Sequence, residues 1–163
     1  MDGLAELVGR ELADELGRAA ERVAHCVGQL SDEQVWWRPP HGLNSVGNLV
    51  LHLAGNVRQL IVSGVGGAAD VRDRQAEFDA RTPTPAADLL AALRAAVDDA
   101  RAALTAQTAD SWLQVRTVQG NPATGLAAAV RSVAHFRGHT QEITHLARAL
   151  VGDRYRYAGP PPG

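Results

Sequence analysis

The sequence predicts an all-α fold, a four-helix bundle, and three observations lead to that prediction. Four segments of the 163-residue chain repeat apolar residues at three- to four-residue spacing, which is the period of an amphipathic helix. The segments between them contain Pro, Gly or Asn clusters, which interrupt helices. No segment shows the sustained apolar–polar alternation of a strand. The length is that of one domain, which we place at residues 1–152, before a Pro/Gly-rich tail at 153–163.

The first predicted helix covers residues 2–29, where leucine and alanine recur at the helical period and charged residues fill the remaining surface. The next segment, 29–44, contains Trp36-Trp37 and then Pro39-Pro40. Paired prolines prevent a helix from continuing, because each lacks a backbone donor and clashes with the preceding turn. This segment is therefore predicted to be a long connection.

The second predicted helix begins at Asn44 or Ser45, since either side chain can cap the free amides of a first turn, and it ends near Val62. Its surface is apolar almost all round. One polar stripe interrupts that surface and consists of Ser45, Asn48, His52, Asn56 and Gln59. From spacing alone, this stripe is either the solvent-exposed face of the helix or the lining of a polar cavity at the bundle centre.

The third predicted helix covers 85–107 and is rich in alanine, which has the highest helix propensity and lets neighbouring helices approach closely. It starts at Pro85, because proline is accepted in the first turn of a helix. The connection 108–123 follows, and within it residues 113–116 are the candidate for a short extended piece. The fourth predicted helix covers 124–150.

Composition excludes several classes of function. The net charge is −2, whereas a nucleic-acid partner favours a basic surface. All 16 basic residues are arginine, so no side chain can form a Schiff base. A single cysteine rules out an internal disulfide and a zinc site built from thiolates, which leaves histidine and carboxylate to hold any metal. Without an apolar stretch of about 18 residues or a secretory signal, we expect a cytoplasmic protein with no membrane partner.

The fourth predicted helix carries the residues most suggestive of a site. His135, His139 and Glu142 share one stripe of the helical wheel, at the spacing that ordinarily faces a core. Two histidines four residues apart can both reach one metal ion. The alternative is a pair of partly exposed histidines on the helix surface. The opposite face carries Val130 and Val133, so spacing alone does not say which face points inward.

The other reactive side chains are expected to have no part in such a site. His25 and His145 are expected to pack or to lie at the surface, and His41 falls in a loop after Pro40. Cys26 has no basic partner nearby in its helix, which favours an inert, packed thiol over a nucleophile.

Three sequence blocks, at 44–56, 72–78 and 135–139, resemble the DinB-like superfamily in order and spacing. The resemblance implies a four-helix bundle of the DinB/YfiT-like type, usually a homodimer, with a divalent metal ion bound by three histidines. In this chain those ligands would be His52, His135 and His139. We expect zinc, with nickel, iron and manganese as alternatives.

The chain departs from the family after its last histidine, where Gln141 replaces a glycine and Glu142 replaces a glutamine. Glu142 is therefore the candidate catalytic residue: it would orient a ligand histidine, accept a proton or add a fourth ligand. Asn48 and Asn56 are expected to support the ligand histidines or to face a cofactor or substrate.

The resemblance also implies an activity, because characterised relatives include thiol-dependent enzymes that use mycothiol or bacillithiol. The leading hypothesis is a metal-dependent S-transferase that acts on a small-molecule substrate with a low-molecular-weight thiol as cosubstrate. The alternatives are a metal-dependent hydrolase and a non-catalytic, metal-stabilised binding or assembly module. Spacing alone favours a solvated linker for Arg72–Phe78, whereas the match to the family block indicates a segment that packs over the bundle near the site.

Overall fold

The structure is a computed structural model that describes residues 2–81 and 83–157. The prolines of the predicted tail, at 160–162, lie outside the described residues. The described part of the tail starts with a short 3-10 helix, Gly152–Arg154. The backbone oxygen of Arg156 then accepts hydrogen bonds from the side chains of His25, at 2.6 Å, and Gln29, at 3.1 Å. This part of the tail is therefore packed on the bundle.

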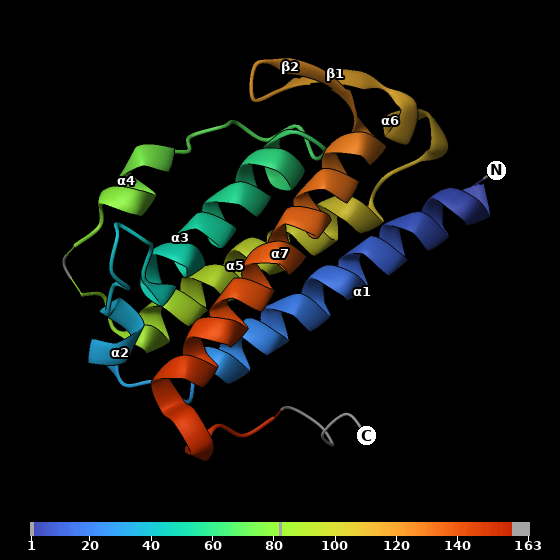
Figure 1. The fold of residues 1–163 in the computed structure, drawn as a ribbon. Helices are drawn as coiled ribbons and strands as arrows, with labels where there is room; N and C mark the ends of the chain where they lie inside the picture. The colour runs from blue at the N-terminus through green and yellow to red at the C-terminus, as the bar shows by residue number, and fades with distance from the viewer. Residues whose placement is uncertain (1, 82, 158–163) are drawn as a thin grey trace.

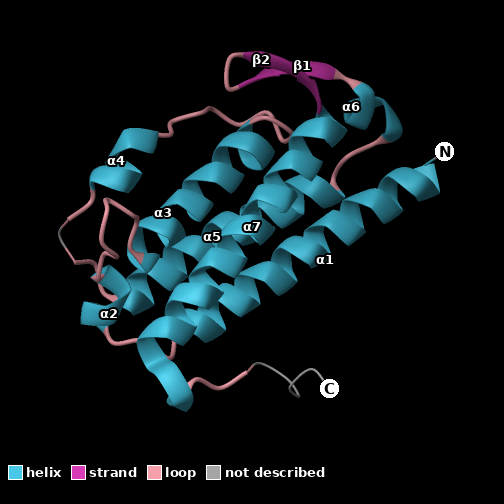
Figure 2. Ribbon diagram, in the orientation of Figure 1, coloured by secondary structure: helices cyan, strands magenta, loops and turns pink. Residues whose placement is uncertain are grey.

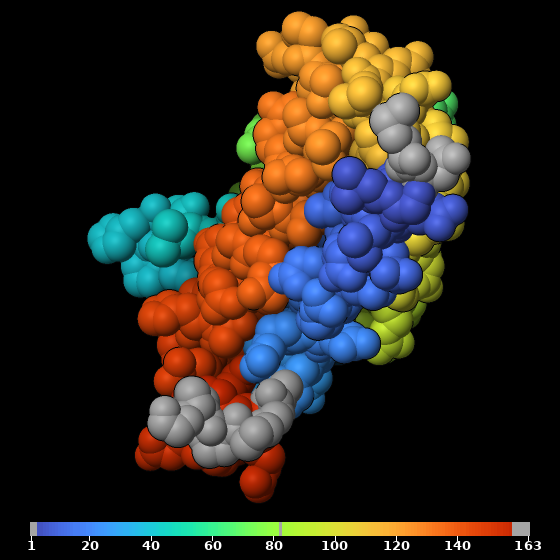
Figure 3. All heavy atoms as spheres, turned by 90° about the vertical axis from the view of Figure 1, so that its right-hand side faces the viewer, coloured from blue at the N-terminus to red at the C-terminus, as the bar shows by residue number. Residues whose placement is uncertain are grey.

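Four long helices form the bundle, in agreement with the sequence prediction: α1 (Asp2–Val27), α3 (Val46–Val57), α5 (Ala86–Thr105) and α7 (Gly125–Val151). α1 packs against α5 and α7, and α3 packs against the same two helices, so α1 and α3 lie diagonally across the bundle (Figure 1). α1 and α7 run side by side along one face of the molecule (Figure 3). None of the described helices combines the length and the apolarity needed to cross a membrane.

Side-chain caps start two of these helices, and the one at Ser45 was predicted from the sequence. The Ser45 hydroxyl accepts a hydrogen bond from the amide of Asn48 at the start of α3, and Thr124 does the same for Ala127 at the start of α7. α3 continues directly into a π-helical turn, η1 (Arg58–Ser63), which completes the second predicted helix. Such wide turns within helices frequently occur at functional sites.

The core lies between the four helices, and its largest fully buried side chains include Phe136, Leu16 and Leu49. α1 and α5 approach closely at Gly9, where an added Cβ would lie 2.5 Å from the backbone oxygen of Leu104. A side chain at Gly9 would therefore force the two helices apart.

Three short helices occupy segments that the sequence predicts as connections: α2 (Asp32–Trp36), α4 (Arg74–Asp79) and α6 (Ala109–Leu113). Each begins at a side-chain cap, provided by Ser31, Asp73 and Thr108 respectively. Helices this short contain too few residues to show a helical period, which explains why periodicity misses them. α4 packs on the outer side of α3.

A β-hairpin precedes α7 (Figure 2); its first strand overlaps the short extended piece predicted at 113–116, and its second strand was not predicted. β1 (Val115–Val118) pairs antiparallel with β2 (Asn121–Thr124). The two turn residues, Gln119 and Gly120, have positive φ angles of 53° and 77°, as tight hairpin turns require. A proline within β2 hides this strand from sequence reasoning, since proline argues against strand structure.

Candidate metal centre

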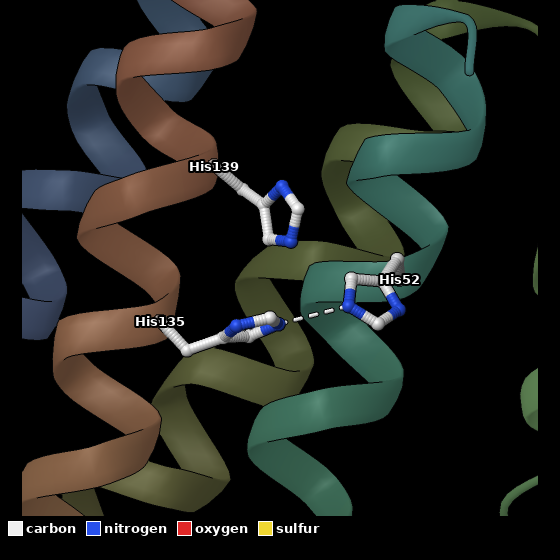
Figure 4. A group of neighbouring side chains, drawn as sticks. All are labelled: His52, His135 and His139. Carbon is white, nitrogen blue, oxygen red and sulfur yellow. Dashed lines mark hydrogen bonds between the residues drawn. The ribbon is translucent and has the colours of Figure 1, made fainter. Parts of the chain in front are cut away.

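Three imidazoles meet between α3 and α7 (Figure 4). His52 comes from the middle of α3, and His135 and His139 come from successive turns of α7. One ring nitrogen from each lies within 4.8 Å of the other two, and the two Nε2 atoms of His52 and His135 are 2.9 Å apart. This arrangement can hold one metal ion.

The histidine stripe of α7, whose direction the spacing left open, does not face the core. The core-facing side of α7 carries Phe136, Thr140 and Ile143, all of them buried. His135 and His139 lie at the edge of this side, half-buried, and turn toward α3. A helical wheel measures angles around one helix but does not say where its neighbours are, which is why spacing alone left this direction open.

The polar stripe of α3 is buried, so of the two interpretations the solvent-exposed face is wrong. Asn48, His52 and Asn56 are each less than 9% exposed. The segment that contains α4 covers His52 from outside, and α7 covers it from the other side. The interpretation of Arg72–Phe78 as a segment packed over the bundle is therefore confirmed.

Glu77, on α4, fixes the orientation of His52. The Nδ1–H of His52 donates a hydrogen bond of 3.0 Å to Oε2 of Glu77, which leaves the Nε2 lone pair directed into the cluster. A carboxylate behind a ligand histidine commonly sets its tautomer and raises its basicity. The sequence block 72–78 hinted at this segment, but nothing in the spacing assigned Glu77 to His52.

Glu77 is in turn held by Arg72 in a two-pronged ion pair. Arg72 Nε donates to Oε1 at 2.6 Å and Nη2 donates to Oε2 at 2.7 Å, and the two side chains are only 4% and 9% exposed. Burial by itself would raise the pKa of Glu77, but the hydrogen bonds from Arg72 and His52 outweigh it and lower that pKa below its usual value. Glu77 is therefore a carboxylate at neutral pH.

Asn48 fastens the α4 segment to α3. Its side-chain amide donates to the backbone oxygens of Glu77, at 2.8 Å, and Ala80, at 3.2 Å. Its Oδ1 accepts hydrogen bonds from Ser45 and Arg38. Asn48 thus supports the ligand histidine indirectly, by holding the segment that carries Glu77.

Gly55 makes this packing sterically feasible. A Cβ at Gly55 would lie 1.9 Å from Oε1 of Glu77 and 2.9 Å from Nε of Arg72. The carboxylate and guanidinium therefore occupy the space that any side chain at this position would need.

Glu142 performs for His139 the role that Glu77 performs for His52. The Nδ1–H of His139 donates to Oε2 of Glu142 at 2.7 Å, which directs Nε2 toward the other two imidazoles. Of the three roles considered for Glu142, this hydrogen bond corresponds to the orienting one. Its side chain is 44% exposed and lies behind the histidine, outside the group of atoms that could hold a metal.

His135 completes the cluster as a neutral base. Burial and the charges of His139, His52 and two nearby arginines, Arg72 and Arg74, lower the pKa of His135 to about 4. Its imidazole is therefore neutral at neutral pH, which is the form that binds metal ions.

A cavity of about 220 Å³ adjoins the cluster, with His52 and His135 in its wall. Asn56 also lines it, and its Oδ1 accepts a hydrogen bond of 3.0 Å from Ser132, which ties α3 to α7. Asn56 is thus placed where it can face a bound molecule, whereas Asn48 is fully buried behind the site.

Comparison with known proteins assigns this chain to a family. A family model described as a protein of unknown function, DUF1572, matches residues 8–163. The chain belongs to this family. No match is found among curated proteins.

Two crystal structures share the fold of this DUF1572 chain. One is a DinB-like protein from Bacillus cereus ATCC 10987, with 19% sequence identity, a TM-score of 0.66, and coverage of 81% of this chain and 85% of that one. The other is a conserved protein from Enterococcus faecalis, with 18% identity, a TM-score of 0.76, and coverage of 90% and 98%. These likenesses show the fold, so the helical bundle that the resemblance to the DinB-like superfamily implies is confirmed.

The remaining histidines and the cysteine lie outside the cluster in this DUF1572 member. His41 is an exposed turn residue with a positive φ of 65°, and His145 is exposed. The Cys26 thiol is buried next to the hydroxyl groups of Thr144 and Tyr155. Burial and the contact with Cys26 raise the pKa of Tyr155 to about 12. The packed thiol predicted from the sequence is thus confirmed.

Proposed function

We propose that this protein is a divalent-metal-dependent enzyme, with His52, His135 and His139 as its metal ligands, that transfers a low-molecular-weight thiol to a small electrophilic substrate. The observation that carries the proposal is the cluster of three imidazole nitrogens within 4.8 Å beside a cavity. The S-transferase reaction is supported by the family resemblance of the three sequence blocks.

The donor set fits a catalytic ion better than a structural one. Structural zinc sites are closed by four protein ligands, whereas three protein ligands leave a position for a reacting group. Two imidazole nitrogens on one tetrahedral zinc ion lie about 3.3 Å apart, from a Zn–N distance of about 2.05 Å. The 2.9 Å between His52 and His135 is close to that value, so small side-chain movements suffice.

Other residues around the cluster orient its histidines or face the cavity. Glu77 and Glu142 keep the ligand nitrogens directed inward, and Asn56 presents an amide to the cavity. When bound, a divalent ion at this site would supply Lewis acidity toward a coordinated thiol or water. Because Cys26 is buried among other side chains, the reacting sulfur would arrive with a cosubstrate.

The ligand assignment is tested by metal analysis of protein purified without an affinity tag. Mass spectrometry should find about one divalent ion per chain, and the variants His52→Ala and His139→Ala should lose it. His145→Ala is the matched control, because it removes an exposed histidine from α7 and should leave the metal content unchanged. If His52→Ala and His139→Ala retained as much metal as His145→Ala, the ligands would lie elsewhere.

The reaction class is tested with an electrophilic probe, 1-chloro-2,4-dinitrobenzene, in the metal-loaded protein. We expect turnover only when a low-molecular-weight thiol is added, and its loss in His135→Ala. Turnover that continues without thiol would contradict the transferase and favour hydrolysis of the probe.

A further inference from the structure

We infer that the cavity beside the three histidines binds the oxyanion group of a small substrate, a carboxylate or a phosphate, through the guanidinium groups of Arg74 and Arg131. This inference rests on the proposed function and adds the substrate class to it.

The cavity wall carries an excess of positive charge. Three of the described residues that line it are arginines, Arg72, Arg74 and Arg131, and none is acidic. Arg72 is neutralised by its ion pair with Glu77. Within the described ranges, Arg74 and Arg131 form no ion pair, so their two charges are not compensated by the protein. Both side chains are exposed to solvent, so an anion that enters the cavity would replace water as their partner.

Both free arginines are next to the histidine cluster. Arg131 is on α7, one helical turn before His135. Arg74 begins α4, and its guanidinium lies 4.8 Å from the centre of the Phe78 ring. The same ring lies 4.8 Å from the imidazole of His52.

The chemistry of the wall suits an oxyanion. The planar guanidinium group pairs with carboxylate and phosphate through two parallel hydrogen bonds. The amides of Asn56 and Gln119 line the same cavity and can add neutral hydrogen bonds. Its volume, about 220 Å³, is below the roughly 300–1,000 Å³ typical of sites for drug-sized ligands, which points to a small molecule.

The test is a titration of the full chain. It is monitored by NMR through the signals of the arginine Nε–H groups and the glutamine side-chain amides. The probes are propionate, inorganic phosphate and the neutral amide propionamide, added to metal-free protein whose helix content is checked by circular dichroism. We expect saturable shifts with propionate or phosphate, and whichever of the two binds more tightly identifies the oxyanion. Propionamide should bind at least tenfold more weakly than the preferred anion. Equal binding of propionate, phosphate and propionamide would overturn the inference.

Two double variants decide whether these arginines are responsible. Arg74→Gln/Arg131→Gln should weaken binding of the preferred anion at least tenfold. Arg10→Gln/Arg94→Gln removes the same charge from exposed positions outside the cavity and should leave binding unchanged. Equal affinity in the two double variants would contradict the inference. The comparison is repeated with propionate on zinc-loaded protein, so that it does not depend on the metal-free fold.

Zinc stoichiometry separates the two proposals. Arg74→Gln/Arg131→Gln should still bind one zinc ion, because neither arginine is a ligand. Selective anion binding without zinc binding would count against the proposed function alone. Zinc binding without selective anion binding would count against this inference alone.

Discussion

Glu77 Oε2 accepts a 3.0 Å hydrogen bond from Nδ1 of His52, although 25 residues separate the two in the sequence. The contact joins α4, a short helix within a connection, to the middle of a bundle helix. Arg72 neutralises the carboxylate, and Asn48 fixes the backbone that carries it. The position of one candidate ligand therefore depends on a segment outside the four-helix bundle.

Removal of the Glu77 carboxylate should weaken metal binding. Loss of a carboxylate behind a ligand histidine typically costs about 10- to 100-fold in metal affinity. We therefore expect Glu77→Ala to lower zinc affinity by about that factor, measured by competition with a chromophoric chelator. Glu6→Ala, which removes an exposed carboxylate from α1, is the control. Equal affinities in the two variants would contradict the role of Glu77.

A methyl group at Gly55 should have a similar effect through sterics alone. The added Cβ of Gly55→Ala would overlap Oε1 of Glu77 and push the carboxylate away from His52. We expect both zinc affinity and the melting temperature to fall. In the control, Gly138→Ala, the Cβ enters open space on α7, so higher helix propensity should stabilise the protein by about 0.5–1 kcal/mol. Equal changes in zinc affinity and melting temperature in the two variants would mean that the close approach at Gly55 is unimportant.

Removal of Arg72 should destabilise the fold strongly, because it leaves the buried Glu77 carboxylate unpaired. Loss of one partner of a buried ion pair typically costs about 3–5 kcal/mol in the free energy of unfolding. Arg72→Ala should approach that loss in urea denaturation, and Arg72→Met/Glu77→Leu should recover much of it. Arg101→Ala breaks the exposed pair with Asp14 and should cost less than about 1 kcal/mol. If Arg72→Ala lowered the free energy of unfolding by as little as Arg101→Ala does, the ion pair would not be buried as described.

Asn48→Ala should loosen the α4 segment without unfolding the bundle. The variant removes the hydrogen bonds that hold the backbone oxygens of Glu77 and Ala80. Limited trypsin digestion should therefore cut faster at Arg74 and Arg81, with the four long helices still protected. Asn121→Ala, in the exposed hairpin, should not change the cleavage rate at these two sites. Unchanged cleavage in Asn48→Ala would show that other contacts hold the segment.

Sequence reasoning succeeded where the information is local. The long helices follow from apolar periodicity, and the cap at Ser45 follows from side-chain chemistry at a helix start. It missed α4 and the second strand of the hairpin, because both are too short for a period to emerge. It also left open the direction of the α7 histidines, because that direction depends on where α3 lies.

The amino-acid pattern by itself determined four helices, a polar stripe on the second, and two histidines one turn apart on the fourth. Six histidines against one cysteine also determined that imidazole, not thiolate, would hold a metal. Only the tertiary structure decided that the stripe is buried, that Glu77 and Glu142 stand behind two of the histidines, and that Arg74 and Arg131 border the cavity. The physical reason is that periodicity describes one helix at a time, whereas a site depends on distances between elements far apart in the chain.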